Sequence, residues 1–311
     1  FNLIDLIMNV DCVIVTYNRL SLLKECITAV KGQSYPARKI YVIDNNSTDG
    51  TLEFLEKFSQ DSQVKVINLT ENIGGAGGFS RGIKEAVMAG ADWVWVMDDD
   101  TIPYSDALEK MLKTIDLTKN VGYVCSKVLW TDETPHRMNM PGYSIGTQKG
   151  VLYNAFSNRD TPAFLIHHAS FVSLLVNAKA VKSAGLPISE FFIWGDDIEY
   201  TMRISSLGYI GFYVDNSIVL HKTPTNYQPY PDTAPTNTAW KFYYQARNTA
   251  YLKRRKTKNR LCFLLSIINK YRVYIHRINK RKTNDKLIFK KYVRKGCWDG
   301  LTFNPQIEYL P

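Results

Sequence analysis

Short apolar runs alternate with amphipathic segments along the first hundred residues. Residues 22, 23, 26, 27 and 30 are apolar at helical spacing, and TLEFLEKF (51–58) and FSRGIKEAVMAG (79–90) have the same character. Between them lie β-branched or aromatic runs, which predict strands: VDCVIVTYN (10–18), KIYVIDNNSTDG (39–50), VKVINLTEN (64–72) and DWVWVM (92–97). Alternation of strand and helix at this pitch predicts right-handed crossovers and an α/β fold with a parallel sheet.

The second half of the chain continues the alternation after an interruption. A helix is expected from Ser105 to about Ile115, but the turn-rich stretch 131–163 gives no clear prediction. Further elements are expected in four segments: a strand in VGYVCSKVLW (121–130), a strand and helix in 167–185, a loop and helix in 191–209, and a strand in GFYVDNSIVLH (211–221). A proline-rich connector, 224–235, follows.

Each of the first four predicted strands ends in polar or glycine-rich residues. These endings are TYNR (16–19), DNNSTDG (44–50), NIGGAGG (72–78) and DDD (98–100). In open α/β sheets, ligands bind outside the carboxyl ends of the strands. The four endings are therefore expected to form one polar rim.

Three consecutive aspartates after a buried strand require a compensating positive charge, because ionised groups repel one another and are costly to desolvate. Asp98 and Asp100 are two positions apart and would share a face of an extended segment. They could converge on a divalent cation, which prefers hard oxygen ligands. A helix cap or a solvated turn is the alternative.

The segment ENIGGAGGFSRG (71–82) places four glycines before a predicted helix. Such a turn would let backbone N–H groups approach phosphate oxygens at the positive helix end. It is not the dinucleotide fingerprint, and a tight connection from strand to helix explains it equally well.

A second acidic cluster lies in FFIWGDDIEYTMR (191–203), where Trp194 precedes Asp196, Asp197 and Glu199. An aromatic ring that packs on a sugar beside a carboxylate that accepts a hydroxyl proton would suit a general-base site. A capped helix start, with Asp196 as the cap, is compatible with the same pattern. His221 follows an apolar strand and is either a metal ligand or a hydrogen-bonded structural residue.

The amino-acid composition limits which classes of protein the chain can belong to. The chain has 311 residues, of which 45% are hydrophobic, enough for a substantial core. Its five cysteines are widely spaced without a CxxC pair, which argues against a disulfide framework or a structural zinc site and favours a reducing, cytoplasmic compartment. The first residues show neither a signal peptide pattern nor a span.

The charge is concentrated near the end of the chain. The total is +10, and residues 253–295 hold 17 Lys or Arg against one acid, Asp285. The apolar residues of LCFLLSIINKYRVYIHRI (261–278) suit this region to lie on an anionic membrane. Nucleic acid, or simply a solvated basic face, is an alternative.

Taken together, the motifs resemble the inverting family 2 glycosyltransferases of the GT-A fold, and bacterial galactofuranosyltransferases in particular. The blocks that carry the resemblance span residues 10–223 in order: VIVTYNR (13–19), IDNNSTDG (43–50), NIGGAGGFSRG (72–82), MDDD (97–100), FIWGDDIEYTMR (192–203) and His221. Rhamnosyltransferases are similar as well. The fold implied is a mixed, mainly parallel sheet flanked by helices, with a basic helical C-terminal extension.

The resemblance also implies roles for individual residues. Asp197 matches the catalytic base, with Trp194, Asp196 and Glu199 at acceptor-binding positions. Asp98, Asp100 and His221 match ligands of Mn²⁺ or Mg²⁺. The positions that match nucleotide-sugar contacts are Thr16, Arg19, Asp44, Asn46, Asn72, Gly75, Gly78, Asp98 and Asp99. Gly195 separates Trp194 from the acid pair, a departure from the family pattern that affects where the ring lies.

The implied activity is transfer of galactofuranose from UDP-galactofuranose to a lipid-linked glycan in cell-surface polysaccharide synthesis. The alternative donor is dTDP-rhamnose. The expected location is the cytoplasmic face of a bacterial membrane, which residues 236–311 would contact. The expected transferase domain is 8–235. It is divided into a nucleotide-sugar half (8–130) and an acceptor half (131–235). A nucleic-acid-binding protein is disfavoured because the acidic rim would repel phosphate. The presence of Asp98, Asp100 and Asp197 argues against a catalytically inactive polysaccharide-binding scaffold. The sequence gives no prediction of the oligomeric state.

Overall fold

The computed structural model describes residues 8–143 and 162–311. Most of the stretch that the sequence left unassigned, 144–161, lies outside the described residues, as do residues 1–7.

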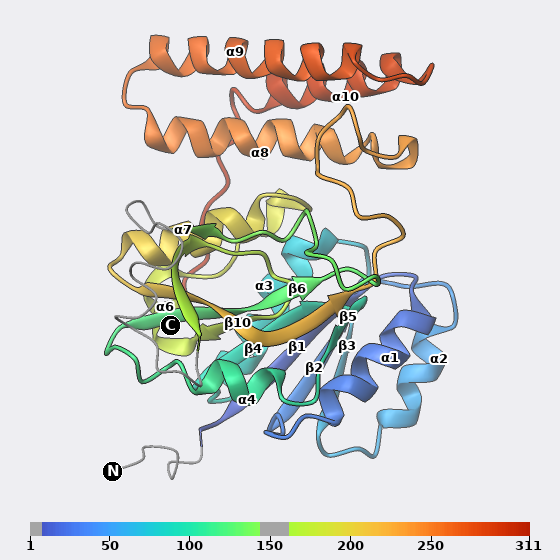
Figure 1. The fold of residues 1–311 in the computed structure, drawn as a ribbon, viewed down its shortest axis with the longest axis vertical. Coiled ribbons are helices and arrows are strands. Elements are labelled where there is room, and N and C mark those ends of the chain that lie inside the picture. Colours follow the sequence, from blue (N-terminus) through green and yellow to red (C-terminus); the bar gives the residue numbers. More distant parts are fainter. Residues whose placement is uncertain (1–7, 144–161) are drawn as a thin grey trace.

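In the described part of the chain, ten strands form one mixed sheet (Figure 1). The order is β3-β2-β1-β4-β9-β6-β10-β8-β7, and β5 pairs with β10. Within this sheet β5, β8 and β9 run against the other strands. The strands are β1 (Val10–Thr16), β2 (Lys39–Asp44), β3 (Val64–Asn68), β4 (Trp93–Asp98), β5 (Thr101–Pro103), β6 (Val121–Leu129), β7 (Gly142–Tyr143), β8 (Ala163–His168), β9 (Leu174–Asn177) and β10 (Ile210–His221).

Helices cover both faces of the sheet. The helices of the body are α1 (Leu20–Lys31), α2 (Thr51–Leu55), α3 (Gly74–Met88), α4 (Ala107–Leu112), α6 (Ala178–Ala184) and α7 (Asp196–Ser206), with short 3₁₀ turns η2 (Glu56–Phe58), η3 (Ser189–Phe191) and η4 (Thr236–Thr238). Every residue of β1 is buried, and its side chains divide between two cores. Val13 and Val15 pack with residues of α3, whereas Cys12 and Ile14 pack with residues of α1. Burial on both faces explains why this strand is almost continuously apolar.

Three further helices form a separate layer above the body (Figure 1). They are α8 (Lys241–Lys256), α9 (Arg260–Asn279) and α10 (Lys286–Asp299). α9 turns Phe263, Ile267, Tyr274 and Ile278 inward, at helical spacing. The chain then returns to the body, where the N–H of Leu186 donates to the carbonyl oxygen of Glu308 at 2.8 Å. Among the described helices, none combines the length and the apolar character needed to cross a bilayer.

The mixed, mainly parallel sheet flanked by helices and the helical C-terminal region confirm the predicted fold class. Three of the described strands were missed: β5 has only three residues, β7 has two and lies in the unassigned stretch, and β8 (AFLIHH) begins at the end of that stretch. α4 is shorter than predicted, Ala107–Leu112. α3 begins at Gly74 rather than after the glycines.

Candidate functional site

The aspartate triplet lies at the carboxyl edge of the sheet, where strand pairing brings it beside His221. β4 ends at Asp98, and Asp99 and Asp100 lead into β5. β5 pairs antiparallel with the end of β10, which is His221. The N–H of Lys222 also donates to the carbonyl oxygen of Asp100 at 2.8 Å. This pairing joins two segments that are far apart in the sequence.

Asp98, Asp100 and His221 form a cluster with the geometry of a cation site. Each offers one ligand atom, and the three atoms lie within 4.8 Å of one another. Oδ1 of Asp100 lies 3.0 Å from Nε2 of His221, yet it is buried and receives no hydrogen bond from the described residues. A buried oxygen without a partner is costly, and carboxylates with an imidazole are a donor set that Mn²⁺ accepts. The residues present therefore fit a divalent cation.

Arg19 supplies part of the positive charge that the sequence analysis assigned to a metal ion. Its guanidinium pairs with Asp100 and lies 3.4 Å from Oδ1 of Asp99. Thr16 donates a hydrogen bond from Oγ1 to Asp99 at 2.8 Å. The Arg19 side chain is 41% exposed, whereas both carboxylates are buried. Arg19 thus faces the buried acids from the solvent side, where an anionic ligand would approach.

The three aspartates differ in their electrostatics. Burial raises the pKa of Asp98, and the charge of Asp100 adds to the rise. Burial also raises the pKa of Asp99, to about 7, against the opposing effect of Arg19. For Asp100, burial would raise the pKa, but the ion pairs with His221 and Arg19 outweigh it and hold the pKa below its usual range. Asp100 is therefore ionised at neutral pH, as a cation ligand must be.

The second acidic cluster opens α7. The residue that caps this helix is Gly195, with a φ of 93°, so Asp196 is not the cap that the sequence suggested. Asp196 and Asp197 stand in the first turn, and Oδ1 of Asp197 accepts a hydrogen bond from the N–H of Ile198 at 2.7 Å. Burial raises the pKa of Asp197 to about 6; the bond from Ile198 opposes the rise, and the charge of Asp98 adds to it. The two acidic clusters are thus close enough to influence each other.

Glu199 forms ion pairs with two arginines, and its predicted contact with an acceptor stays a prediction. Its carboxylate, 3% exposed, accepts from Arg203 at 2.8 Å on Oε2 and from Arg255 at 3.1 Å on Oε1. Arg203 is on α7 itself, whereas Arg255 belongs to α8. Glu199 therefore links the helical layer to α7.

Asn248 of α8 holds the loop before α7 in an unusual conformation. Phe192 and Trp194 both have a φ of 64°, in the left-handed region that non-glycine residues rarely occupy. Nδ2 of Asn248 donates to three carbonyl oxygens of this loop: those of Phe191 at 3.0 Å, Ile193 at 3.3 Å and Trp194 at 2.9 Å. Asn248 was not predicted from the sequence, because nothing near it in the sequence marks its role.

Lys241, the first residue of α8, was missed as well. Its Nζ lies 5.6 Å from the ring centre of Trp194, whose indole packs edge-on against the buried Phe242. Burial lowers the pKa of Lys241, as does Arg19, while Asp98 and Asp100 oppose this. The charge of Lys241 is thus felt at the aspartate triplet, from a different layer of the fold.

The other rim residues lie at the ends of β2 and β3. Asp44 is buried at the end of β2, and Asn46 is exposed with a φ of 64°. Oδ1 of Asn72 accepts from the N–H of Gly74 at 2.8 Å. Asn45, which the sequence analysis did not single out, donates from Nδ2 to the carbonyl oxygen of Gly74 at 3.3 Å. Their contacts with a nucleotide remain predictions.

Some glycines of this segment serve packing, and the expected contact of the segment with phosphate stays a prediction. The N–H of Gly74 goes to Asn72, and that of Ala76 donates to the carbonyl oxygen of Phe192 at 3.2 Å. A Cβ on Gly78 would come within 2.6 Å of Val15 on β1, so this glycine lets α3 lie close to the sheet. Gly75 has free space, because an added Cβ would meet only Phe79, at 3.9 Å.

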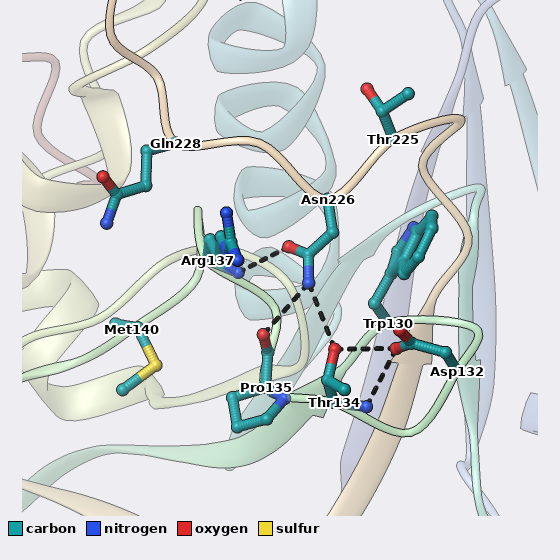
Figure 2. Close-up of a pocket in the computed structure, with 9 residues that line it drawn as sticks. All are labelled: Trp130, Asp132, Thr134, Pro135, Arg137, Met140, Thr225, Asn226 and Gln228. Carbon is teal, nitrogen blue, oxygen red and sulfur yellow. Dashed lines mark hydrogen bonds between the residues drawn. The ribbon is translucent and has the colours of Figure 1, made fainter. Parts of the chain in front are cut away.

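A cavity of about 600 Å³ opens next to this region, between the loop after β6 and the loop after β10 (Figure 2). It is lined by Trp130, Asp132, Thr134, Pro135, Arg137, Met140, Thr225, Asn226 and Gln228. No residue predicted from the sequence lines it. Nε1 of Trp130 donates to the carbonyl oxygen of Thr223 at 2.8 Å, two residues after His221. The cavity is therefore a neighbour of the cation cluster rather than part of it.

Comparison with known proteins places these features in a family. The family model "Glycosyl transferase family 2" matches residues 11–183, which is more than half of the chain. Galactofuranosyltransferase GlfT1 of Mycolicibacterium smegmatis is 28% identical over 207 residues, which are 64% of this chain and 66% of that protein. Glycosyltransferase AglE of Haloferax volcanii is 28% identical over 217 residues, 68% of this chain and 66% of that protein. The matches thus span slightly less than two thirds of these relatives.

Among solved structures, a crystal structure of GalNAc-T7 with UDP, GalNAc and Mn²⁺ is similar. Its TM-score is 0.59 at 14% sequence identity, and the match covers 93% of this chain and 55% of that one. At this identity the likeness concerns the fold, and it confirms the GT-A architecture expected from the sequence.

Proposed function

Because the chain belongs to glycosyl transferase family 2, we propose that it is a metal-dependent, inverting glycosyltransferase. The observation that carries this proposal is the cluster of Asp98, Asp100 and His221 within electrostatic reach of Asp197. The proposed donor is UDP-galactofuranose, because the similar protein GlfT1 of Mycolicibacterium smegmatis is a galactofuranosyltransferase. dTDP-rhamnose is the alternative donor, and the proposed acceptor is a lipid-linked glycan of cell-surface polysaccharide.

In the proposed reaction, Asp197 is the general base. Its carboxylate accepts the proton of an acceptor hydroxyl, and the hydroxyl oxygen forms a bond to the anomeric carbon from the face opposite the leaving group. The bond from that carbon to the diphosphate oxygen breaks, the diphosphate takes the electron pair, and the anomeric configuration inverts. The raised pKa of Asp197, about 6, makes this carboxylate a stronger base than an exposed aspartate.

Asp98, Asp100 and His221 would hold Mn²⁺ or Mg²⁺, which would neutralise negative charge on the diphosphate. The protein's own cations would assist: Arg19 from the loop after β1 and Lys241 from α8 both influence the triplet. Donor binding is assigned further to Thr16, Asp44, Asn46, Asn72 and the glycines at 75 and 78, as the family pattern implies. Trp194 and Asp196 are proposed to contact the acceptor.

We assign the transferase domain to residues 8–235 and a membrane-associating role to residues 236–311. Large apolar side chains are exposed on α9 and α10: Leu261, Leu264, Leu265, Ile268, Val273, Leu287, Ile288 and Trp298. Basic residues such as Arg260, Arg272 and Lys291 are exposed among them. Apolar groups interleaved with basic ones suit an anionic bilayer surface, and each Lys or Arg near it contributes about 1 kcal/mol. The proposed location is the cytoplasmic face of the membrane.

A donor screen tests the proposed activity. Release of nucleoside diphosphate would be measured for UDP- and dTDP-sugars with bacterial glycolipid acceptor, with Mn²⁺ or with a chelator. We expect UDP-galactofuranose to be consumed only with Mn²⁺ and acceptor, giving an inverted anomeric centre by NMR. Turnover that is unchanged by the chelator would refute the metal dependence, and binding of duplex DNA in place of any sugar nucleotide would refute the enzyme class.

A further inference from the structure

His221 is held from behind by a residue that no motif includes. Its Nδ1 lies 2.8 Å from Oδ1 of Asn139, in the segment between β6 and β7. Nδ2 of Asn139 in turn donates to Oγ of Ser170 at 3.0 Å. The amide therefore has a partner on each side, with its oxygen toward the imidazole and its nitrogen toward the serine.

The opposite ring nitrogen of His221 faces the acids. Nε2 lies 3.0 Å from Oδ1 of Asp100, and this oxygen receives no hydrogen bond from the described residues. In the neutral imidazole, which is the form that binds a metal ion, an Nδ1–H that donates to Asn139 leaves the lone pair on Nε2. That lone pair would point to the space shared with Asp98 and Asp100, which is where a cation would be coordinated.

The segment that carries Asn139 is itself fastened. His136 packs its ring at 4.5 Å from that of His221 and places Nε2 2.8 Å from Oγ1 of Thr223. Asn226, shown in Figure 2, accepts from the N–H of Arg137 at 2.8 Å and donates to the carbonyl oxygen of Pro135 at 3.2 Å. These contacts tie the segment before Asn139 to the chain that follows His221.

We propose that Asn139 is a positioning residue of the cation site: by accepting the Nδ1–H of His221, it fixes the tautomer and ring orientation that direct Nε2 to Asp98 and Asp100. This inference rests on the metal dependence proposed above. Partners of this kind orient metal-binding histidines, and their loss typically weakens metal binding about 10- to 100-fold.

The test compares Asn139→Leu, which removes the acceptor at similar volume, with Asn139→Asp, which keeps an acceptor oxygen. Asn120→Leu, at an exposed position, is the matched control. Mn²⁺ affinity would be measured by electron paramagnetic resonance of free Mn²⁺, without any sugar nucleotide. We expect Asn139→Leu to bind Mn²⁺ about 10- to 100-fold more weakly, and the other two variants to remain close to wild type.

A second readout requires no metal. Long-range ¹H–¹⁵N NMR of the wild-type imidazoles, at a pH where His221 is neutral, reports which nitrogen carries the proton. Protonated Nδ1 supports the inference, and protonated Nε2 overturns it. Unchanged Mn²⁺ affinity in folded Asn139→Leu would overturn it too. If the wild type binds no Mn²⁺, the proposed metal dependence fails, while the NMR result still decides the role of Asn139.

Discussion

Asn248 donates a hydrogen bond to the carbonyl oxygen of Trp194 at 2.9 Å, which links the middle of α8 to the loop before the proposed base. The C-terminal helical layer is therefore part of the active-site framework as well as a carrier of basic charge. Truncation of the chain after about Asn248 is one way to test whether the basic C-terminal region binds membranes. Such a truncation would cut α8 in half and remove Arg255, the partner of Glu199, so substitutions are the better test.

We expect Asn248→Ala to weaken both the fold and the reaction. Three carbonyl oxygens of the loop lose their donor, and each hydrogen bond contributes about 0.5–1.5 kcal/mol. The free energy of unfolding, measured with urea, should fall by about 1–3 kcal/mol. Asn279→Ala, at an exposed helical position, should leave both stability and turnover unchanged. A stable, fully active Asn248→Ala protein would contradict the bracing role.

Asp197→Asn should abolish transfer while donor binding persists. The amide can still accept the hydrogen bond from Ile198, but it cannot take a proton from the acceptor hydroxyl. We expect turnover to fall by about 10²- to 10⁴-fold, with UDP affinity close to wild type by calorimetry. Asp116→Asn, an exposed control, should retain full turnover. Near wild-type turnover in Asp197→Asn would rule out this base.

The rate should rise with pH through the pKa of the proposed base. Asp197 acts only as a carboxylate, and burial raises its pKa to about 6. Transfer at saturating Mn²⁺ should therefore increase between about pH 5 and 7 and level off above that. A bound cation would move the rising part of the pH–rate profile to lower pH, since positive charge favours the ionised carboxylate. A rate that falls over this range would contradict the assignment.

The raised pKa of Asp197 also predicts that its carboxylate destabilises the folded protein at neutral pH. A carboxyl group whose pKa is about 6 in the fold, against about 3.9 unfolded, destabilises the native state once the pH exceeds both values. In metal-free protein, Asp197→Asn should thus be more stable than wild type at pH 7.5, by at most about 3 kcal/mol. The difference should disappear below about pH 3, where both states are protonated. Urea titrations of Asp197→Asn and wild type at the two pH values would measure this difference. Equal stability of the two proteins at both pH values would exclude a raised pKa at Asp197.

Membrane attachment should depend on the exposed face of α9. Replacing Leu265 and Ile268 by Ser, and Arg272 by Gln, removes apolar contact and one charge without touching the buried side. Binding to vesicles that contain anionic lipid should weaken in sedimentation assays, and wild-type binding should fall with added salt. Leu207→Ser, at an exposed position on the body, is the control. Equal binding to neutral vesicles at high salt would refute the electrostatic part.

Local patterns were enough to predict a good part of this protein. Strand and helix periodicity gave the four parallel strands from β1 to β4, since burial of β1 on both faces leaves an unmistakable apolar run. The aspartate triplet followed from residue types that are costly to bury without a compensating charge, whereas the choice of Asp197 as the base came from the family resemblance and stays a prediction. The position of His221 beside Asp100 agreed with the family pattern, although the pairing of β5 with β10 that places it there was not predicted.

The sequence by itself therefore determined the class of fold and the acids at the edge of the sheet, because both depend on neighbours along the chain. Only the tertiary structure decided which polar groups are already satisfied: Glu199 pairs with Arg255 from another layer, and the N–H of Ala76 goes to Phe192. It also decided that Asn139 and Asn248 act on distant residues. These relationships depend on the packing of segments far apart in sequence, and that packing sets the partners that most buried polar groups find.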